Sequence, residues 1–290
     1  MVALLTLLLV MVAVAFFTLL ERKVLGYIHL RKGPNKPGPV GVVVPFADAI
    51  KLLLKEMTCP TLGNQTLFNT VALAIIGVPI LLWYVFPHSA PALDPKVMCV
   101  YIIAIASIGV YGTLGAGWRS NRKFRLLGAL RAVAQTISYE VSITLIILGA
   151  VLFFFFDITQ EKQLRAWGWL TAITIMFAVR VLAEANRSPF DFAEGERELV
   201  SGFNTEYSSV LFVMVFLAEY IAIIFMSVLC SMLFLAASYA ELLVGGLAIG
   251  FFYVWARGTL PRFRYDQLMY LAWKVFLPIT LLFLVGVGTL

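Results

Sequence analysis

The chain contains 290 residues, of which 61% are apolar and only 13% are charged, and its formal net charge is +6. Its mean hydropathy of +0.94 is far from that of soluble domains, in which about 25% of residues are charged. This composition excludes a soluble globular protein and indicates an integral membrane protein.

The apolar runs are continuous rather than alternating, and several approach the about 20 residues that a helix needs to cross about 30 Å of hydrocarbon. Helices satisfy their own backbone hydrogen bonds in lipid, so they are favoured over a barrel. We predict an all-α, polytopic membrane protein with residues 1–290 in one domain, and a first run that is a retained span rather than a signal peptide. Eight transmembrane helices are expected near residues 2–20, 67–87, 97–118, 132–156, 166–186, 207–232, 238–256 and 270–290.

The basic residues fall almost entirely on one side of this topology. All but Lys96, Lys162 and Arg165 belong to the first, third, fifth and seventh loop regions. Because basic loops stay on the cytoplasmic or matrix side, we predict that the odd-numbered loops face that side. The membrane topology then explains the positive net charge of the chain, and nucleic acid is not expected as a partner.

Residues that bind cofactors are scarce. The three cysteines (Cys59, Cys99 and Cys230) lie far apart, and His29 and His88 are isolated. Neither a metal or iron-sulfur site nor a disulfide framework follows from this spacing. Glycine patterns typical of nucleotide binding are absent from the sequence, so we expect no cofactor bound by this chain.

Two features follow the first predicted span. The stretch "LERKVLGYIHLRKGPNKPGPVG" is rich in Gly and Pro, which predicts a constrained turn. The next stretch, "PFADAIKLLLKEM", begins at Pro45 and predicts an amphipathic helix lying in the membrane surface. Its apolar face comprises Phe46, Ala49, Ile50, Leu53, Leu54 and Met57. Such a helix is either a simple anchor or a gate for a lipid-soluble substrate that enters from the bilayer.

Two predicted spans carry a buried acid. Glu140 lies at least a helical turn inside the fourth span, beside Thr136 and Thr144 on one helix face, and Glu219 lies inside the sixth. An ionisable residue at that depth costs about 3 kcal/mol and is a functional candidate facing a cavity. The alternative is a structural ion pair or hydrogen bond between helices.

A dense acidic segment connects the fifth and sixth spans. Pro189 and Gly195 interrupt any helix there, and phenylalanines alternate with the acids, which indicates partial burial. Its acids, with the preceding Glu184, are Glu184, Asp191, Glu194, Glu196, Glu198 and Glu206. A solvated loop is the ordinary meaning of a charge run. If the loop acids are instead buried together, desolvation and like charge raise their pKa, so with Glu140 and Glu219 they would form a row of proton-holding sites.

Long motifs in this sequence resemble the chain 1 family of NADH:ubiquinone oxidoreductase, the respiratory complex I. They are the two stretches quoted above together with "LGALRAVAQTISYEV", "LAEANRSPFDFAEGERELVSGFNTEY" and "LPRFRYDQLMYLAWKVFLP". The resemblance implies a mitochondrial inner-membrane subunit with ubiquinone as substrate and the odd-numbered loops on the matrix side. Its partners would be other membrane and hydrophilic-arm subunits, which carry FMN and the iron-sulfur clusters, and the chain alone would be inactive.

The resemblance also implies roles for particular residues. A quinone path would be lined or supported by Glu21, Arg22, Arg31, Asp48, Phe216, Arg262 and Arg264. An acidic passage that couples quinone reduction to proton translocation would comprise Glu140, Glu184, Asp191, Glu194, Glu196, Glu198, Glu206 and Glu219, with Arg187 as a counter-charge.

The sequence departs from the family pattern at two places. Arg197 stands where a small polar residue is expected, and an arginine there lowers the pKa of neighbouring acids such as Glu196 and Glu198. The third loop, "WRSNRKFRLLGALRA", is more basic than expected, which favours contact with anionic lipid or with an accessory subunit.

Two alternatives belong to other functional classes. A proton-coupled secondary transporter predicts internal symmetry and discontinuous helices at the midplane, and the sequence shows no internal repeat. A purely structural anchor for a redox arm would not need Glu140 and Glu219 inside its spans.

Overall fold

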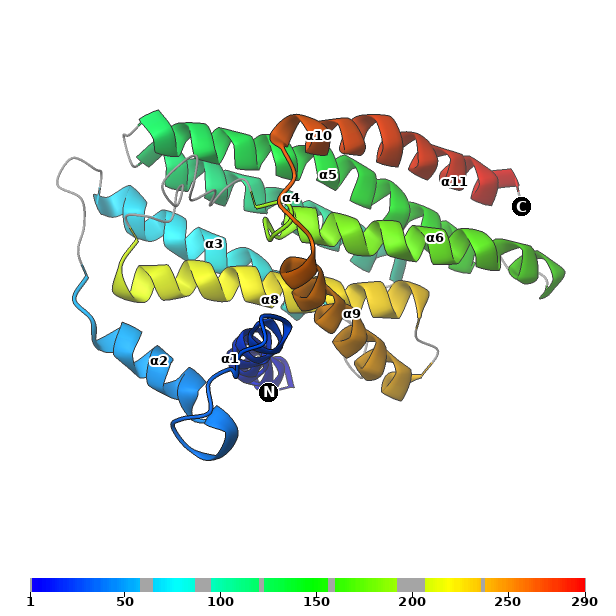
Figure 1. The fold of residues 1–290 in the computed structure, drawn as a ribbon. Helices are drawn as coiled ribbons and strands as arrows, with labels where there is room; N and C mark the ends of the chain where they lie inside the picture. Colours follow the sequence, from blue (N-terminus) through cyan, green and yellow to red (C-terminus); the bar gives the residue numbers. More distant parts are fainter. Residues whose placement is uncertain are drawn as a thin grey trace.

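The computed structural model describes residues 2–57, 65–86, 95–119, 123–155, 160–191, 207–235 and 238–289. Within these ranges every regular element is helical (Figure 1), which confirms the all-α prediction. The elements are α1 (Val2–Ile28), a 3₁₀ turn (Pro39–Gly41), α2 (Val44–Leu54), α3 (Gln65–Val85), α4 (Pro95–Arg119), α5 (Lys123–Phe155), α6 (Gln160–Glu184), α8 (Ser209–Phe234), α9 (Tyr239–Thr259), α10 (Tyr265–Tyr270), the π-helical segment η3 (Leu271–Phe276) and α11 (Leu277–Thr289).

Seven helical stretches of the described residues are long and apolar enough to cross a membrane. They are Leu5–Ile28, Thr66–Val85, Val97–Arg119, Lys123–Leu152, Ser209–Phe234, Ala240–Thr259 and Tyr265–Val287. The predicted span at 166–186 coincides with α6, whose side chains before Thr171 lie outside the described residues. The structure thus supports a polytopic membrane protein, and the total of eight spans stays a prediction.

Two helices extend well beyond their predicted ends. The first span was expected to end at residue 20, but α1 continues to Ile28. The constrained turn therefore starts later, where the Arg31 amide donates to the Gly26 carbonyl at 2.7 Å. Gly33 is needed in this turn because a Cβ there would lie 2.8 Å from the Cα of Lys23. Similarly, α5 starts nine residues before the expected 132 and is 33 residues long, about 50 Å of helix.

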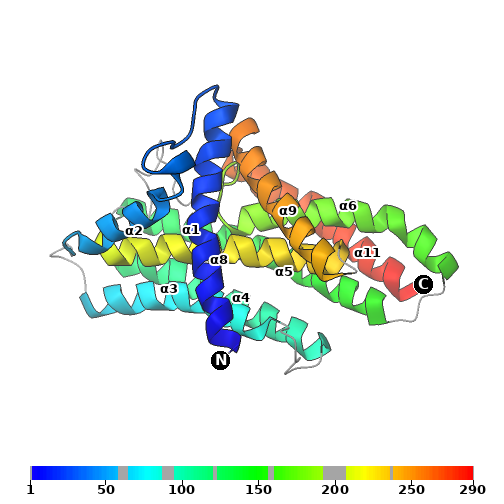
Figure 2. The ribbon, with the colours of Figure 1, turned by 90° about the horizontal axis from the view of Figure 1, so that it is seen from below.

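The helix α8 packs against five others, α1, α2, α3, α6 and α9. Figure 2 shows α1 crossing α8 at a steep angle, whereas α3, α5 and α6 run broadly along the direction of α8. Buried side chains of α8 such as Ile221 and Phe225 belong to the main hydrophobic core. Polar residues on α8 consequently face protein neighbours.

The amphipathic segment forms α2, which contacts α1 and α8. Phe46 of α2 meets Phe16 of α1 edge to face, with 6.1 Å between ring centroids. Ile50 and Leu53 remain more than half exposed, which fits the predicted apolar face, while its position in the membrane surface stays a prediction.

Candidate functional site

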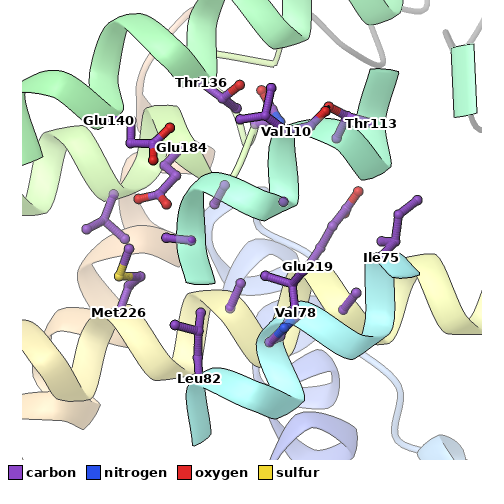
Figure 3. Close-up of a pocket in the computed structure, with 18 of the residues that line it drawn as sticks. Ile75, Val78, Leu82, Val110, Thr113, Thr136, Glu140, Glu184, Glu219 and Met226 are labelled. Atoms are coloured by element: carbon purple, nitrogen blue, oxygen red, sulfur yellow. The ribbon is translucent and has the colours of Figure 1, made fainter. Parts of the chain in front are cut away.

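Three carboxylates that lie far apart in the sequence line one cavity. Glu140 from α5, Glu184 from α6 and Glu219 from α8 border a space of about 150 Å³ that is otherwise mainly apolar. Figure 3 shows Glu140 and Glu184 pointing toward each other at one end of the cavity. The fold therefore collects acids from three helices in one place.

Gln135 holds the end of α6 in position. Its side chain is fully buried, and its Nε2 donates to the carbonyls of Ala183 at 2.6 Å and Phe190 at 2.9 Å. These bonds tie α5 to both the last turn of α6 and the turn that follows it. Because Gln135 and Glu140 lie on the same helix, the clamp also fixes Glu184 relative to Glu140.

The cavity acids differ in how their charge is compensated. Glu219 forms an ion pair with Arg187 at 3.0 Å, and the Arg187 guanidinium lies 4.5 Å from the centre of the Tyr220 ring. By contrast, the buried Oε2 of Glu184 has no hydrogen-bond partner among the described residues. An unpaired buried charge is costly, so the charged form of Glu184 lacks the direct stabilisation that Glu219 has.

A further acid, which is buried, lies close to these three. Glu21 of α1 is only 5% exposed, accepts a hydrogen bond from the Tyr220 hydroxyl at 2.6 Å and forms an ion pair with Arg257 of α9. Adjacent residues of α8 thus belong to two clusters, because Glu219 lines the cavity while Tyr220 bonds to Glu21. Arg187 lies between the two clusters, in contact with both residues of α8.

The remaining quinone-path candidates among the described residues do not line the cavity. Arg22 forms an exposed ion pair with Asp48 at 2.6 Å, which joins α1 to α2. Arg31 is exposed on the turn after α1. Phe216 is half-buried beneath Arg187, with 5.5 Å from the guanidinium to the ring centre.

The polar contacts after α6 form another group. Asp191 accepts from Arg262 at 3.0 Å, so it faces the segment before α10 and does not line the cavity. Arg264 pairs with the neighbouring Asp266 at 3.1 Å on the exposed surface. Four acids of the expected passage, Glu194, Glu196, Glu198 and Glu206, lie outside the described residues, as does Arg197.

Three residues were missed as site candidates by sequence reasoning. Arg257 was counted as a topogenic charge, although it pairs with Glu21. Arg180 was assigned to a charged loop region, but it lies in α6, is fully buried and donates to the Ser142 carbonyl at 2.7 Å. Tyr253 of α9 is 4% exposed. The only available signal was Arg180, an arginine inside an apolar run.

No group of three or more His, Cys, Asp or Glu side chains that could hold a metal ion occurs within the described ranges. The arrangement that the structure does contain, buried carboxylates with arginine and tyrosine neighbours, can hold and exchange protons.

Comparison with known proteins identifies the family. The family model described as NADH dehydrogenase matches residues 1–288. The chain is 49% identical to NADH-ubiquinone oxidoreductase chain 1 of Aedes aegypti over 282 residues, covering 95% of this chain and 90% of the relative. It is 48% identical to the Locusta migratoria chain 1 over 287 residues, with the same coverage. It is 47% identical to the Danio rerio chain 1 over 291 residues, covering 94% of this chain and 88% of the relative. The resemblance seen in the motifs is confirmed, and the chain belongs to the NADH-ubiquinone oxidoreductase chain 1 family, whose members are subunits of the NADH:ubiquinone oxidoreductase complex.

Proposed function

We propose that this chain forms part of the quinone chamber of the complex and couples quinone reduction to proton translocation. The observation that carries the proposal is the continuity between two buried clusters. Glu21, Tyr220 and Arg257 make one cluster, and Arg187 connects it to Glu219 in the three-carboxylate cavity.

The first cluster would respond to the charge of a quinone. On this proposal, ubiquinone enters from the bilayer past α1 and α2, where Arg22 and Asp48 join the two helices. Reduction of a quinone to a quinol consumes two electrons and two protons, so it changes the charge balance in the chamber. The Glu21 side chain is 7% exposed and that of Arg257 is 35% exposed, so this pair would feel such a change more strongly than a pair in bulk water.

The second cluster would receive that change. Arg187 pairs with Glu219 and lies against Tyr220, so displacement of its charge alters the environment of the cavity acids. Glu140 and Glu184 point toward each other at one end of the cavity (Figure 3), and carboxylates that interact strongly titrate as a unit. A shift at one acid is thereby passed along the row toward the proton-pumping subunits.

The remaining parts of the chain would also have roles in the membrane and in the complex. The chain would have eight spans in the mitochondrial inner membrane, with its basic odd-numbered loops in the matrix. The other acids of the segment 191–206, together with Arg31, Phe216, Arg262 and Arg264, would extend the passage and the chamber. Electrons would arrive from FMN and iron-sulfur clusters in partner subunits, and the basic third loop would contact anionic lipid.

The experiment is the substitution Glu140→Gln, which preserves volume and removes the titration. Quinone reduction and proton pumping are measured in membranes that contain the assembled complex. Glu241→Gln, on the exposed first turn of α9, controls for the loss of one acid. Loss of both activities only in Glu140→Gln supports coupling through the cavity; full retention of both would leave Glu140 with a structural role.

A further inference from the structure

The amphipathic helix α2 buries very little of its own surface. Pro45 is its one buried residue, and its apolar side chains Ile50, Leu53 and Leu54 are more than half exposed. A helix with so few buried contacts has low local stability. Each polar bond that holds α2 against its neighbours therefore has a large effect on its position.

Ser209, the first residue of α8, binds the end of α2. Its hydroxyl donates to the carbonyls of Lys55 at 2.5 Å and Leu52 at 3.2 Å. The last four carbonyls of a helix have no partner inside the helix, so Leu52, in the last turn of α2, needs a donor from outside. Because Ser209 is only 2% exposed, its hydroxyl turns toward α2 rather than toward water.

The backbone of Ser209 shows that this position is constrained. Its φ is 54°, a left-handed conformation that is uncommon for residues other than glycine. Such conformations persist where the surrounding structure holds them in place. Glycine would adopt this φ without strain but has no hydroxyl that could bind α2. The hydroxyl is thus the property that serine adds at this position.

Three polar links join α1, α2 and α8 in pairs. Arg22 and Asp48 join α1 to α2, and Glu21 and Tyr220 join α1 to α8. Ser209 joins α2 to α8 at a point about 16 Å of helix before Tyr220. Figure 2 shows α2 beside one end of α8, with α1 crossing α8 farther along. Loss of the Ser209 link would leave the end of α2 free while the other two links remain.

We propose that Ser209 is a positioning residue for ubiquinone, because it holds α2 in the position that binds the apolar tail of the entering quinone. The quinone head would meet the cluster of Glu21, Tyr220 and Arg257, which Ser209 does not contact. A long apolar tail suits the exposed apolar side chains of α2, whereas a short-tailed quinone makes few contacts there. This inference rests on the proposed entry of ubiquinone past α1 and α2.

The test is Ser209→Ala in the assembled complex in membranes, with kinetics measured for a long-tailed and a short-tailed ubiquinone. Without the link α2 is no longer preorganised, so the KM for the long-tailed quinone should rise about fivefold. That change corresponds to about 1 kcal/mol, the contribution of one hydrogen bond. The kcat and the KM for the short-tailed quinone should stay unchanged.

Ser227→Ala is the matched control. Ser227 is buried in the same helix, and its hydroxyl donates within α8, to the Ile224 carbonyl at 2.8 Å. Hydrogen exchange of the amides in residues 44–54 should quicken in Ser209→Ala and not in Ser227→Ala, because α2 opens more often when its end is free. An equal rise in KM for both quinones, or in both variants, would show a general packing defect and overturn the proposal.

A glycine variant separates the hydroxyl from the backbone. Ser209→Gly accepts the left-handed φ without strain and also lacks the hydroxyl, so it should reproduce the changes in KM and in hydrogen exchange. An effect of Ser209→Ala that Ser209→Gly lacks would assign that effect to backbone strain and overturn the role of the hydroxyl.

A labelled quinone separates this inference from the entry path on which it rests. A long-tailed ubiquinone with a photoreactive group along its tail should label α2 in the parent complex. Labelled α2 together with unchanged kinetics and exchange in Ser209→Ala would overturn the role of Ser209 and keep the entry path. Absence of label from α2 would remove the entry path, and the assignment of Ser209 with it.

Discussion

The guanidinium of Arg187 lies 3.0 Å from the carboxylate of Glu219, and both side chains are at most 20% exposed. Arg187 follows α6, whereas Glu219 lies in the middle of α8, so the pair fixes the start of the acidic segment against the central helix. In this position the arginine also covers the ring of Tyr220. The pair therefore combines a structural role with the electrical contact between the two clusters.

Removing the arginine should be much worse than removing the pair. Arg187→Met leaves Glu219 buried without its cation, which costs about 3–5 kcal/mol. We expect a clear fall in the amount of assembled complex on native gels and a lower Tm. The double variant Arg187→Met with Glu219→Gln should recover much of the assembly, because the amide has no charge to compensate; failure to recover would mean that other contacts of Arg187 dominate.

The clamp formed by Gln135 gives a second prediction. Gln135→Leu fills a similar volume but leaves the Phe190 carbonyl without its Gln135 donor, at about 1–3 kcal/mol for a buried group, whereas the Ala183 carbonyl keeps the Asn186 amide at 3.3 Å. The end of α6 should loosen, and limited proteolysis should cut the segment after it faster than in the parent complex.

Ser107→Ala is a suitable control for the clamp, because that hydroxyl bonds to the Ala104 carbonyl within α4. Equal protease resistance of Gln135→Leu and Ser107→Ala would show that the segment does not depend on Gln135.

The exposed pair between α1 and α2 should behave differently from the buried ones. Arg22 and Asp48 are 53% and 32% exposed, and exposed ion pairs contribute about 0–1 kcal/mol. Asp48→Asn should therefore change the Tm of the complex very little. The second measurement is the KM for a soluble quinone. A higher KM with an unchanged Tm would show that Asp48→Asn acts locally, on the entry path.

The sequence predicted the helices better than the contacts between them. Four of the predicted spans, 67–87, 97–118, 207–232 and 238–256, match α3, α4, α8 and α9 to within three residues at each end, because their apolar runs have clear ends. The ends of α1 and α5 were misplaced because charged residues were interpreted as breaks. Glu21 stays inside helix α1 since Arg257, 236 residues later, compensates its charge. Pairings of this kind depend on how the helices pack, and no local pattern in one sequence specifies them.

The residues that line the cavity were also identified singly from the sequence, but their proximity was not. Glu140 and Glu219 were singled out because acids are rare inside spans, and Glu184 because it precedes the acidic segment. Their convergence in one cavity depends on the position of α8 between α3 and α6. Tyr253 gave no signal at all, since a tyrosine in an apolar helix usually only contributes to packing.

We expect replacement of Arg180 to affect the stability of the complex in the opposite way to replacement of Arg187. Its guanidinium is fully buried and bonds to the Ser142 carbonyl, while its Nε and one terminal nitrogen have no hydrogen-bond partner within the described ranges. The ring of Phe276 lies 4.8 Å away and offers only a cation–π contact. Replacing a poorly compensated buried charge with an apolar side chain of similar size is often neutral or stabilising by about 1–4 kcal/mol. Arg180→Met should therefore assemble normally and leave the Tm of the complex unchanged or raised, whereas a loss of stability comparable with that of Arg187→Met would reveal a counter-charge for Arg180 in a neighbouring segment or subunit.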